Sequence, residues 1–196
     1  MEMTESKKDL KVKGALMVAL AMLINGARDI NWTAESELTE ADLNLIKKGI
    51  MSASWYERSL YERMGNAVYK VIGKGQSAGA FEFGKGILAE TMLKIYRGPL
   101  IANEPFELLP KFAEFWGNTW FNFGKAEFER LDKGGIIRIF DPNGMPFQKG
   151  FLAMVRGFFA RMVTESHGKN VIVECDEEKL SDSQLITTAT LHIHWD

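Results

Sequence analysis

The segment PFQKGFLAMVRGFFARMVTESHG, residues 146–168, decides the fold of this chain. Pro146 suits the first turn of a helix, because an amide N–H there would have no partner inside the helix. His167-Gly168 ends the segment, and the apolar residues between these ends recur at helical spacing. They form one stripe, made of Phe147, Phe151, Met154, Val155, Phe158, Phe159 and Met162. The pattern predicts one long helix with an apolar face.

The segments on both sides of this helix have the composition of strands. Two precede it and two follow it, and the links between them are rich in turn-forming or acidic residues. The four expected strands cover residues 120–130, 136–140, 170–174 and 186–195. We therefore expect a ββαββ unit, in which the helix covers one face of an antiparallel four-stranded sheet.

The residues before this unit favour helices. Apolar positions recur at helical spacing in five stretches, residues 12–24, 39–49, 60–72, 77–96 and 105–116. Residues 29–36 have no period and are expected to form a loop, and residues 52–56 a turn. Thr39 and Asp42 have the spacing of a capping box, and Gly84 and Gly86 would let a neighbouring segment approach closely.

These patterns predict a single α+β domain over residues 1–196. Residues 1–9 are expected to be disordered, residues 10–117 to form the helical part and residues 118–196 the ββαββ part. The apolar run at residues 15–24 has ten residues, whereas a membrane helix needs about 20. We therefore expect a core helix and no membrane span.

Composition excludes several classes of protein. With 24 Lys+Arg and 26 Asp+Glu, the net charge is −2, and a nucleic-acid-binding domain usually shows a basic excess. Cys175 is the single cysteine, so neither an intramolecular disulfide nor a cysteine-rich zinc site can form. This cysteine content suits a reducing compartment, and we expect a cytoplasmic protein.

The residues that might carry chemistry form no complete site. His192 and His194 leave the same face of the last expected strand, and Cys175 is the one further soft ligand for a metal. A solvated face of the sheet explains the two histidines better. Acidic neighbours would raise the pKa of the Cys175 thiol rather than activate it. We expect neither a catalytic residue nor a metal site.

Aromatic residues are the feature that remains for function. Together with a methionine they could line an apolar pocket for a small ligand, as such pockets are usually built. The candidate ligand-binding residues are Trp116, Trp120, Phe158 and Met162, with Trp55 at the mouth. An aromatic stripe at helical spacing is also what an ordinary core looks like, and this alternative stays open.

Five short motifs, taken in chain order, resemble an uncharacterised family that is abundant as paralogues in myxobacteria. They are Val12-Lys13-Gly14, Trp55-Tyr56, Leu108-Leu109-Pro110, Gly157-Phe158 and the closing Trp195. That family is similar in layout to the 4-vinyl reductase domains and the haem-nitric-oxide-binding domains, which are sensor or carrier modules with helices packed against an antiparallel sheet. The resemblance covers most of the chain and implies an apolar pocket between helices and sheet.

Two departures from these relatives concern cofactors. The haem-binding relatives carry a Tyr-x-Ser-x-Arg motif and a proximal histidine, whereas this chain has Tyr56-Glu57-Arg58-Ser59 and, in its late helix, only the terminal His167. The 4-vinyl reductase domains often pair two cysteines near the last hairpin, where this chain has Cys175 alone. No cofactor is therefore expected.

The sequence favours a non-enzymatic sensory or regulatory domain that binds a small apolar ligand. A protein–protein interaction module, such as a homodimer or a signalling partner, is the alternative. A third possibility is an enzyme, although the sequence contains no catalytic motif. Such an enzyme would use common carboxylates such as Glu82, Glu90 or Glu114 with Arg97.

Overall fold

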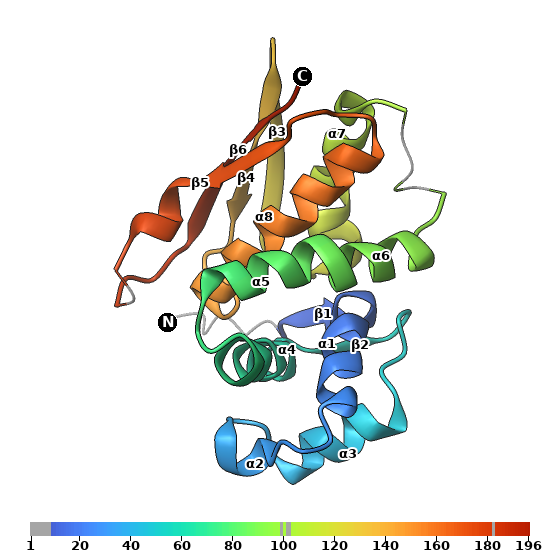
Figure 1. Ribbon diagram of the computed structural model, residues 1–196, viewed down its shortest axis with the longest axis vertical. Coiled ribbons are helices and arrows are strands. Elements are labelled where there is room, and N and C mark those ends of the chain that lie inside the picture. Colours follow the sequence, from blue (N-terminus) through green and yellow to red (C-terminus); the bar gives the residue numbers. More distant parts are fainter. Residues whose placement is uncertain (1–8, 99, 101–102, 182) are drawn as a thin grey trace, which may run out of the picture.

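The computed structural model describes residues 9–98, 100, 103–181 and 183–196 (Figure 1). It has the predicted α+β architecture, with helices packed against an antiparallel four-stranded sheet. The sheet consists of β3 (Lys125–Leu131), β4 (Gly134–Phe140), β5 (Ile172–Cys175) and β6 (Thr188–His194) in the order β3-β4-β6-β5. Residues 1–8 of the segment expected to be disordered lie outside the described residues.

One face of the sheet is buried because its strands alternate apolar and polar residues. Ile137, Ile139, Leu191 and Ile193 are at most 1% exposed and point to this face. Helix α8 (Gln148–Glu165) packs on β5 and β6, while α7 (Pro105–Phe115) packs on β3 and β4. Figure 1 shows both helices on the same side of the sheet. The predicted ββαββ unit is confirmed.

Helix α8 begins later than predicted. Pro146 precedes the helix instead of occupying its first turn, and both Phe147 (φ 28°) and Gln148 (φ 39°) have left-handed backbone conformations. Hydrogen bonds to the segment before β6 hold this turn, since Met145 N–H donates to the Ile186 carbonyl (2.6 Å) and Ile186 N–H donates to Gln148 Oε1 (3.0 Å). Tertiary contacts therefore override the helix preference of Pro146.

The helical half follows the predicted stretches closely. Its longer elements are α1 (Gly14–Gly26), α3 (Glu40–Lys48), α4 (Arg58–Ala67) with η1 (Val68–Ile72), α5 (Ser77–Phe83) with η2 (Gly84–Leu88) and α6 (Ala89–Ile95), and η3 (Trp116–Trp120) after α7. The elements η1, η2 and η3 are wider π-helical turns. The capping box of α3 is present, with Thr39 Oγ1 accepting from Asp42 N–H (3.1 Å) and Asp42 Oδ2 accepting from Thr39 N–H (2.9 Å).

Several short elements were not predicted, among them the 3-10 helix η4 (Asp176–Lys179) in the expected acidic loop before β6. Strands β1 (Lys11–Lys13) and β2 (Trp55–Glu57) form a small antiparallel sheet beside α1, where a helix start and a turn were expected. Helix α2 (Trp32–Glu35) lies inside the expected loop. It forms because Trp32 is buried and its indole N–H donates to the Ile24 carbonyl (3.1 Å). The predicted strand at residue 120 begins only at Lys125, since Trp120 ends η3.

Glycines bring α8 into direct backbone contact with α5 and η2. A Cβ added at Gly84 would overlap the Met154 carbonyl oxygen, and one added at Gly157 would overlap the Phe81 carbonyl oxygen. The expected close approach at Gly84 is thus confirmed, whereas Gly86 has no neighbour within 4 Å of its added Cβ. In the described part of the chain, no helix combines the length and the apolar character needed to cross a bilayer.

Candidate functional site

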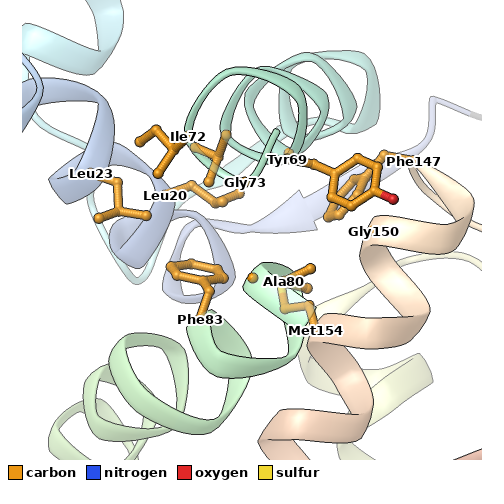
Figure 2. Close-up of a pocket in the computed structure, with 13 residues that line it drawn as sticks. Leu20, Leu23, Tyr69, Ile72, Gly73, Ala80, Phe83, Phe147, Gly150 and Met154 are labelled. Carbon is orange, nitrogen blue, oxygen red and sulfur yellow. The ribbon is translucent and has the colours of Figure 1, made fainter. Parts of the chain in front are cut away.

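An apolar space that could hold a small ligand lies where α1, α4–η1, α5 and the start of α8 meet (Figure 2). Its volume is about 120 Å³, and its lining is almost entirely apolar. The side chains that enclose it include Leu20, Leu23, Val68, Ile72, Ala80, Phe83 and Met154. We call this space the main cavity.

Glycines line the main cavity where the four helical segments converge, and they let neighbouring groups approach closely. Gly65, Gly73, Gly79 and Gly150 all line it. A Cβ on Gly65 would overlap the Phe147 ring, and a Cβ on Gly150 would lie 2.8 Å from the Tyr69 ring. The π-helical turn η1 also lies here, and such turns are frequent at functional sites.

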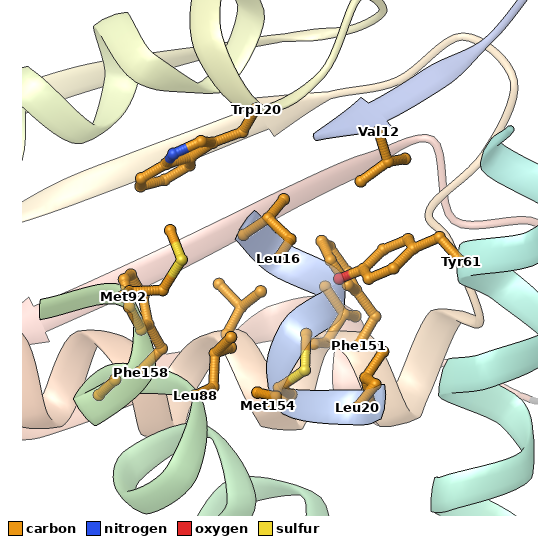
Figure 3. Close-up of a cluster of buried hydrophobic side chains, with 14 of the residues drawn as sticks. Val12, Leu16, Leu20, Tyr61, Leu88, Met92, Trp120, Phe151, Met154 and Phe158 are labelled. Atoms are coloured by element: carbon orange, nitrogen blue, oxygen red, sulfur yellow. The ribbon is translucent and has the colours of Figure 1, made fainter. Parts of the chain in front are cut away.

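Three of the aromatic residues predicted from the sequence lie around a second, smaller apolar cavity, in the buried cluster of Figure 3. Trp116, Trp120 and Phe158 line a cavity of only about 20 Å³, between α1, α4, η3 and α8. Their rings fill the space in edge-on contacts, with 6.3 Å between the ring centroids of Trp120 and Phe158. A volume of this size holds about one water molecule. Met154 lines both cavities.

The other two predicted residues lie elsewhere. Met162 is fully buried on α8 and lines neither apolar cavity. Trp55 is 41% exposed on β2, with the Lys13 ammonium group 4.5 Å from its ring centroid. The structure therefore brings three of the five candidate residues together and separates Met162 and Trp55 from them.

The polar groups buried near the centre serve packing between the two halves of the fold. Arg58 Nη1 lies 2.8 Å from Asp141 Oδ2, and Arg58 Nη2 donates to the Gly144 carbonyl. The guanidinium group also lies over the Phe123 ring, 4.7 Å from its centroid. Arg58 belongs to the helical half and Asp141 follows β4, so this ion pair joins them.

The histidines and the cysteine do not form a site. His192 Nε2 lies 3.1 Å from Asp176 Oδ2, and His194 lies on the exposed face of the same strand. The expected solvated face is thus confirmed, and the described residues contain no group of three metal-ligating side chains. Burial raises the pKa of the Cys175 thiol to about 12, which keeps it protonated and unreactive.

Comparison with solved structures identifies the fold of this chain. No family model and no curated protein matches the chain. An H-NOX protein from S. oneidensis has a similar structure, with a TM-score of 0.63 and 10% identity over 94% of this chain and 96% of that one. An H-NOX protein from K. algicida gives a TM-score of 0.59 and 11% identity, over 94% and 96%. An oxygen-binding H-NOX domain related to soluble guanylate cyclases gives 0.56 and 14%, over 94% and 95%.

The chain therefore has the fold of the H-NOX domains. The layout expected from the haem-nitric-oxide-binding resemblance is confirmed, while nothing in these comparisons supports the resemblance to the myxobacterial paralogous family. At 10–14% identity the likeness establishes the fold alone, and one fold can support unrelated functions.

The residues of this chain do not fit haem, which the name of another similar structure of the H-NOX family mentions. Histidine is a common axial ligand of haem iron, yet no histidine lines either apolar cavity. Cofactor pockets usually measure about 300–1,000 Å³, whereas the two cavities measure about 120 Å³ and 20 Å³. The backbone contacts at Gly84 and Gly157 leave no space between α5 and α8.

Proposed function

We propose that this chain is a non-enzymatic, haem-independent domain that binds a small apolar molecule in the main cavity and serves in sensing or regulation. The observation that supports this is the size and lining of the cavity, about 120 Å³ with almost no polar surface. An engineered apolar cavity of about 150 Å³ in another protein stays dry and binds benzene. The main cavity is close to that volume.

The second cavity extends this proposal to the aromatic residues predicted from sequence. Met154 lines both cavities, and the flexible side chain of methionine adapts easily to its surroundings. A ligand long enough to displace the Met154 side chain would contact Trp116, Trp120 and Phe158. In this proposal these three residues form the inner wall of the site.

Benzene is the probe that tests the main cavity. We expect a saturating concentration of benzene to raise the midpoint of thermal unfolding (Tm) by several degrees, because a ligand that binds only the folded state stabilises it. Ala80→Leu adds three carbon atoms inside the cavity and should abolish the rise. Ala78→Leu makes the same change at an exposed position on α5 and should keep it.

Two outcomes would overturn the proposal. One is a wild-type Tm that does not change with benzene. The other is an equal response of the Ala80→Leu and Ala78→Leu variants, which would place binding outside the main cavity.

Haem independence has a separate test. When haemin is titrated into the purified chain, we expect the absorption spectrum to remain that of free haemin. A shifted Soret band that saturates at one haem per chain would contradict the proposal.

A protein-interaction role is the alternative function. It is favoured by two large apolar side chains close together in sequence and open to solvent, since Met51 is 67% exposed and Trp55 is 41% exposed. Sedimentation velocity over a wide concentration range distinguishes the two functions. A monomer at every concentration would count against a homodimer.

A further inference from the structure

One end of the main cavity is closed by aromatic rings that are held in place. The Tyr69 hydroxyl donates to the Gly75 carbonyl (2.7 Å). The Phe147 ring packs edge-on against the rings of Tyr61 and Phe151, with 5.5 Å between the ring centroids in each pair. Figure 2 shows Tyr69 and Phe147 together at this end of the cavity. We call it the closed end, because these contacts make it a fixed wall.

The opposite end of the main cavity reaches the surface. Figure 2 shows Leu23 and Ile72 on the other side of the cavity from Tyr69 and Phe147. Ile72 lines the cavity and is also 39% exposed. A side chain that contacts both the interior and water forms the edge of an opening. We call this opening the entrance.

The bulk of residue 72 sets the width of the entrance. Among the described residues that line the main cavity, only Ile72 and Gly79 are exposed, and Gly79 has no side chain. Gly79 lies beside Gly73, the residue after Ile72, since a Cβ added at Gly79 would lie 3.5 Å from the Gly73 Cα atom. The Ile72 side chain is therefore the main obstacle at this edge of the cavity.

From this geometry we infer that ligands enter the main cavity between the end of η1 and the start of α5, and that Ile72 controls how fast they enter and leave. A larger side chain at position 72 narrows the passage in both directions. It changes the free and the bound states little, so the affinity stays nearly the same. This inference rests on the proposed function and adds the route of the ligand and the residue that controls it.

Fluorobenzene is a suitable probe, because the described lining of the cavity carries no charged side chain. Its ¹⁹F signal distinguishes free from bound ligand, and exchange NMR on the full chain gives the association rate (kon) and the dissociation rate (koff). For Ile72→Trp we expect both rates to fall by about ten-fold, since a rate falls exponentially as its barrier rises. The dissociation constant is koff/kon, so it should change by less than about three-fold.

A second variant at the same position gives an independent reading. Ile72→Ala widens the entrance, and both rates should rise. Because Ile72 is 39% exposed, neither substitution needs new space in the core. The Tm of each variant without ligand checks that the chain is folded.

Two control variants separate the entrance from other positions. Ile87→Trp makes the same change at an isoleucine of similar exposure (37%) on η2, which does not line the main cavity. Tyr69→Phe removes the hydrogen bond at the closed end. Both variants should exchange fluorobenzene at the rates of the wild type.

The possible failures are distinguishable. If benzene raises the Tm but Ile72→Trp exchanges as fast as the wild type or as Ile87→Trp, the inference is wrong and the proposed function stands. The same holds if Tyr69→Phe speeds the exchange, which would place the entrance at the closed end. A fall in kon with unchanged koff would make residue 72 a wall of the bound ligand, and this too would overturn the inference. If neither benzene nor fluorobenzene binds, both the inference and the proposed function are wrong.

Discussion

The buried ion pair between Arg58 and Asp141 offers the sharpest test of how the two halves are held together. The Arg58 side chain is 8% exposed and the Asp141 side chain 3% exposed, and their nearest atoms, Nη1 and Oδ2, lie 2.8 Å apart. Arg58 also contacts Glu62 through Nε at 2.8 Å. The perturbation that we consider is Arg58→Met, which keeps an apolar stem of similar length.

The expected cost is large, because the substitution leaves the Asp141 carboxylate buried without its cation. Removing one partner of a buried ion pair destabilises proteins by about 3–5 kcal/mol. For a domain of this size, 1 kcal/mol corresponds to about 2–4 °C in Tm. We therefore expect the Tm of Arg58→Met to fall by roughly 6–20 °C.

Urea unfolding followed by circular dichroism measures this cost. Glu62→Gln is the control, because the Glu62 side chain is 32% exposed, so water reaches its carboxylate and its loss should cost less than the loss of the buried partner Asp141. The double variant Arg58→Met/Asp141→Asn should be more stable than Arg58→Met alone, since it no longer buries an unpaired charge. The reasoning is refuted if Arg58→Met costs less than about 1 kcal/mol, a value typical of exposed pairs.

Three further predictions concern packing, reactivity and pH. Gly84→Ala should destabilise the folded chain by about 1–3 kcal/mol through overpacking. Gly86 has open space around it, so Gly86→Ala should stabilise the folded chain by about 0.4–1 kcal/mol. Urea unfolding measures the free energy of unfolding of both variants. Cys175 should react with a thiol reagent at pH 8 far more slowly in buffer than in urea, because burial raises the pKa of its thiol to about 12. The Arg63 guanidinium holds the pKa of Asp42 below its ordinary value of 3.8, so this pair stabilises the fold above pH 3.8 and loses its effect as the pH falls through the lowered pKa. Asp42→Asn should remove that part of the acid-induced loss of stability, as measured by urea unfolding between pH 5 and pH 2.

Sequence periodicity predicted the fold wherever burial is one-sided over several turns. Strands β4 and β6 each bury one face, so their apolar residues alternate with less buried ones. Helix α8 was predicted from its apolar stripe, although it is buried on nearly all sides, with every residue from Gly150 to Val155 buried. Strands β1 and β2 have three residues each, too few for any period. Their pairing depends on contacts between positions more than 40 residues apart, such as Lys11 with Glu57.

The candidate site was harder to predict, because its main cavity depends on how helical segments that are distant in sequence pack together. The aromatic residues chosen from sequence, such as Trp120 and Phe158, fill space by packing on one another. The signal that would have located the main cavity is glycine inside helices. Gly65 and Gly150 each lie within a helix, where glycine costs about 0.5–1 kcal/mol relative to alanine.

Two other glycines, Gly84 and Gly157, explain how an H-NOX fold can exist here without room for haem. Gly84 and Gly157 allow α5, η2 and α8 to touch through their backbones, so direct helix packing occupies the space between them. The buried residues form one continuous apolar cluster that runs from α1 through α8 to the sheet. Direct contacts between side chains and between helices therefore close this core, and the main cavity of about 120 Å³, lined in part by Gly65, Gly73 and Gly150, is the space that the proposed function assigns to a ligand.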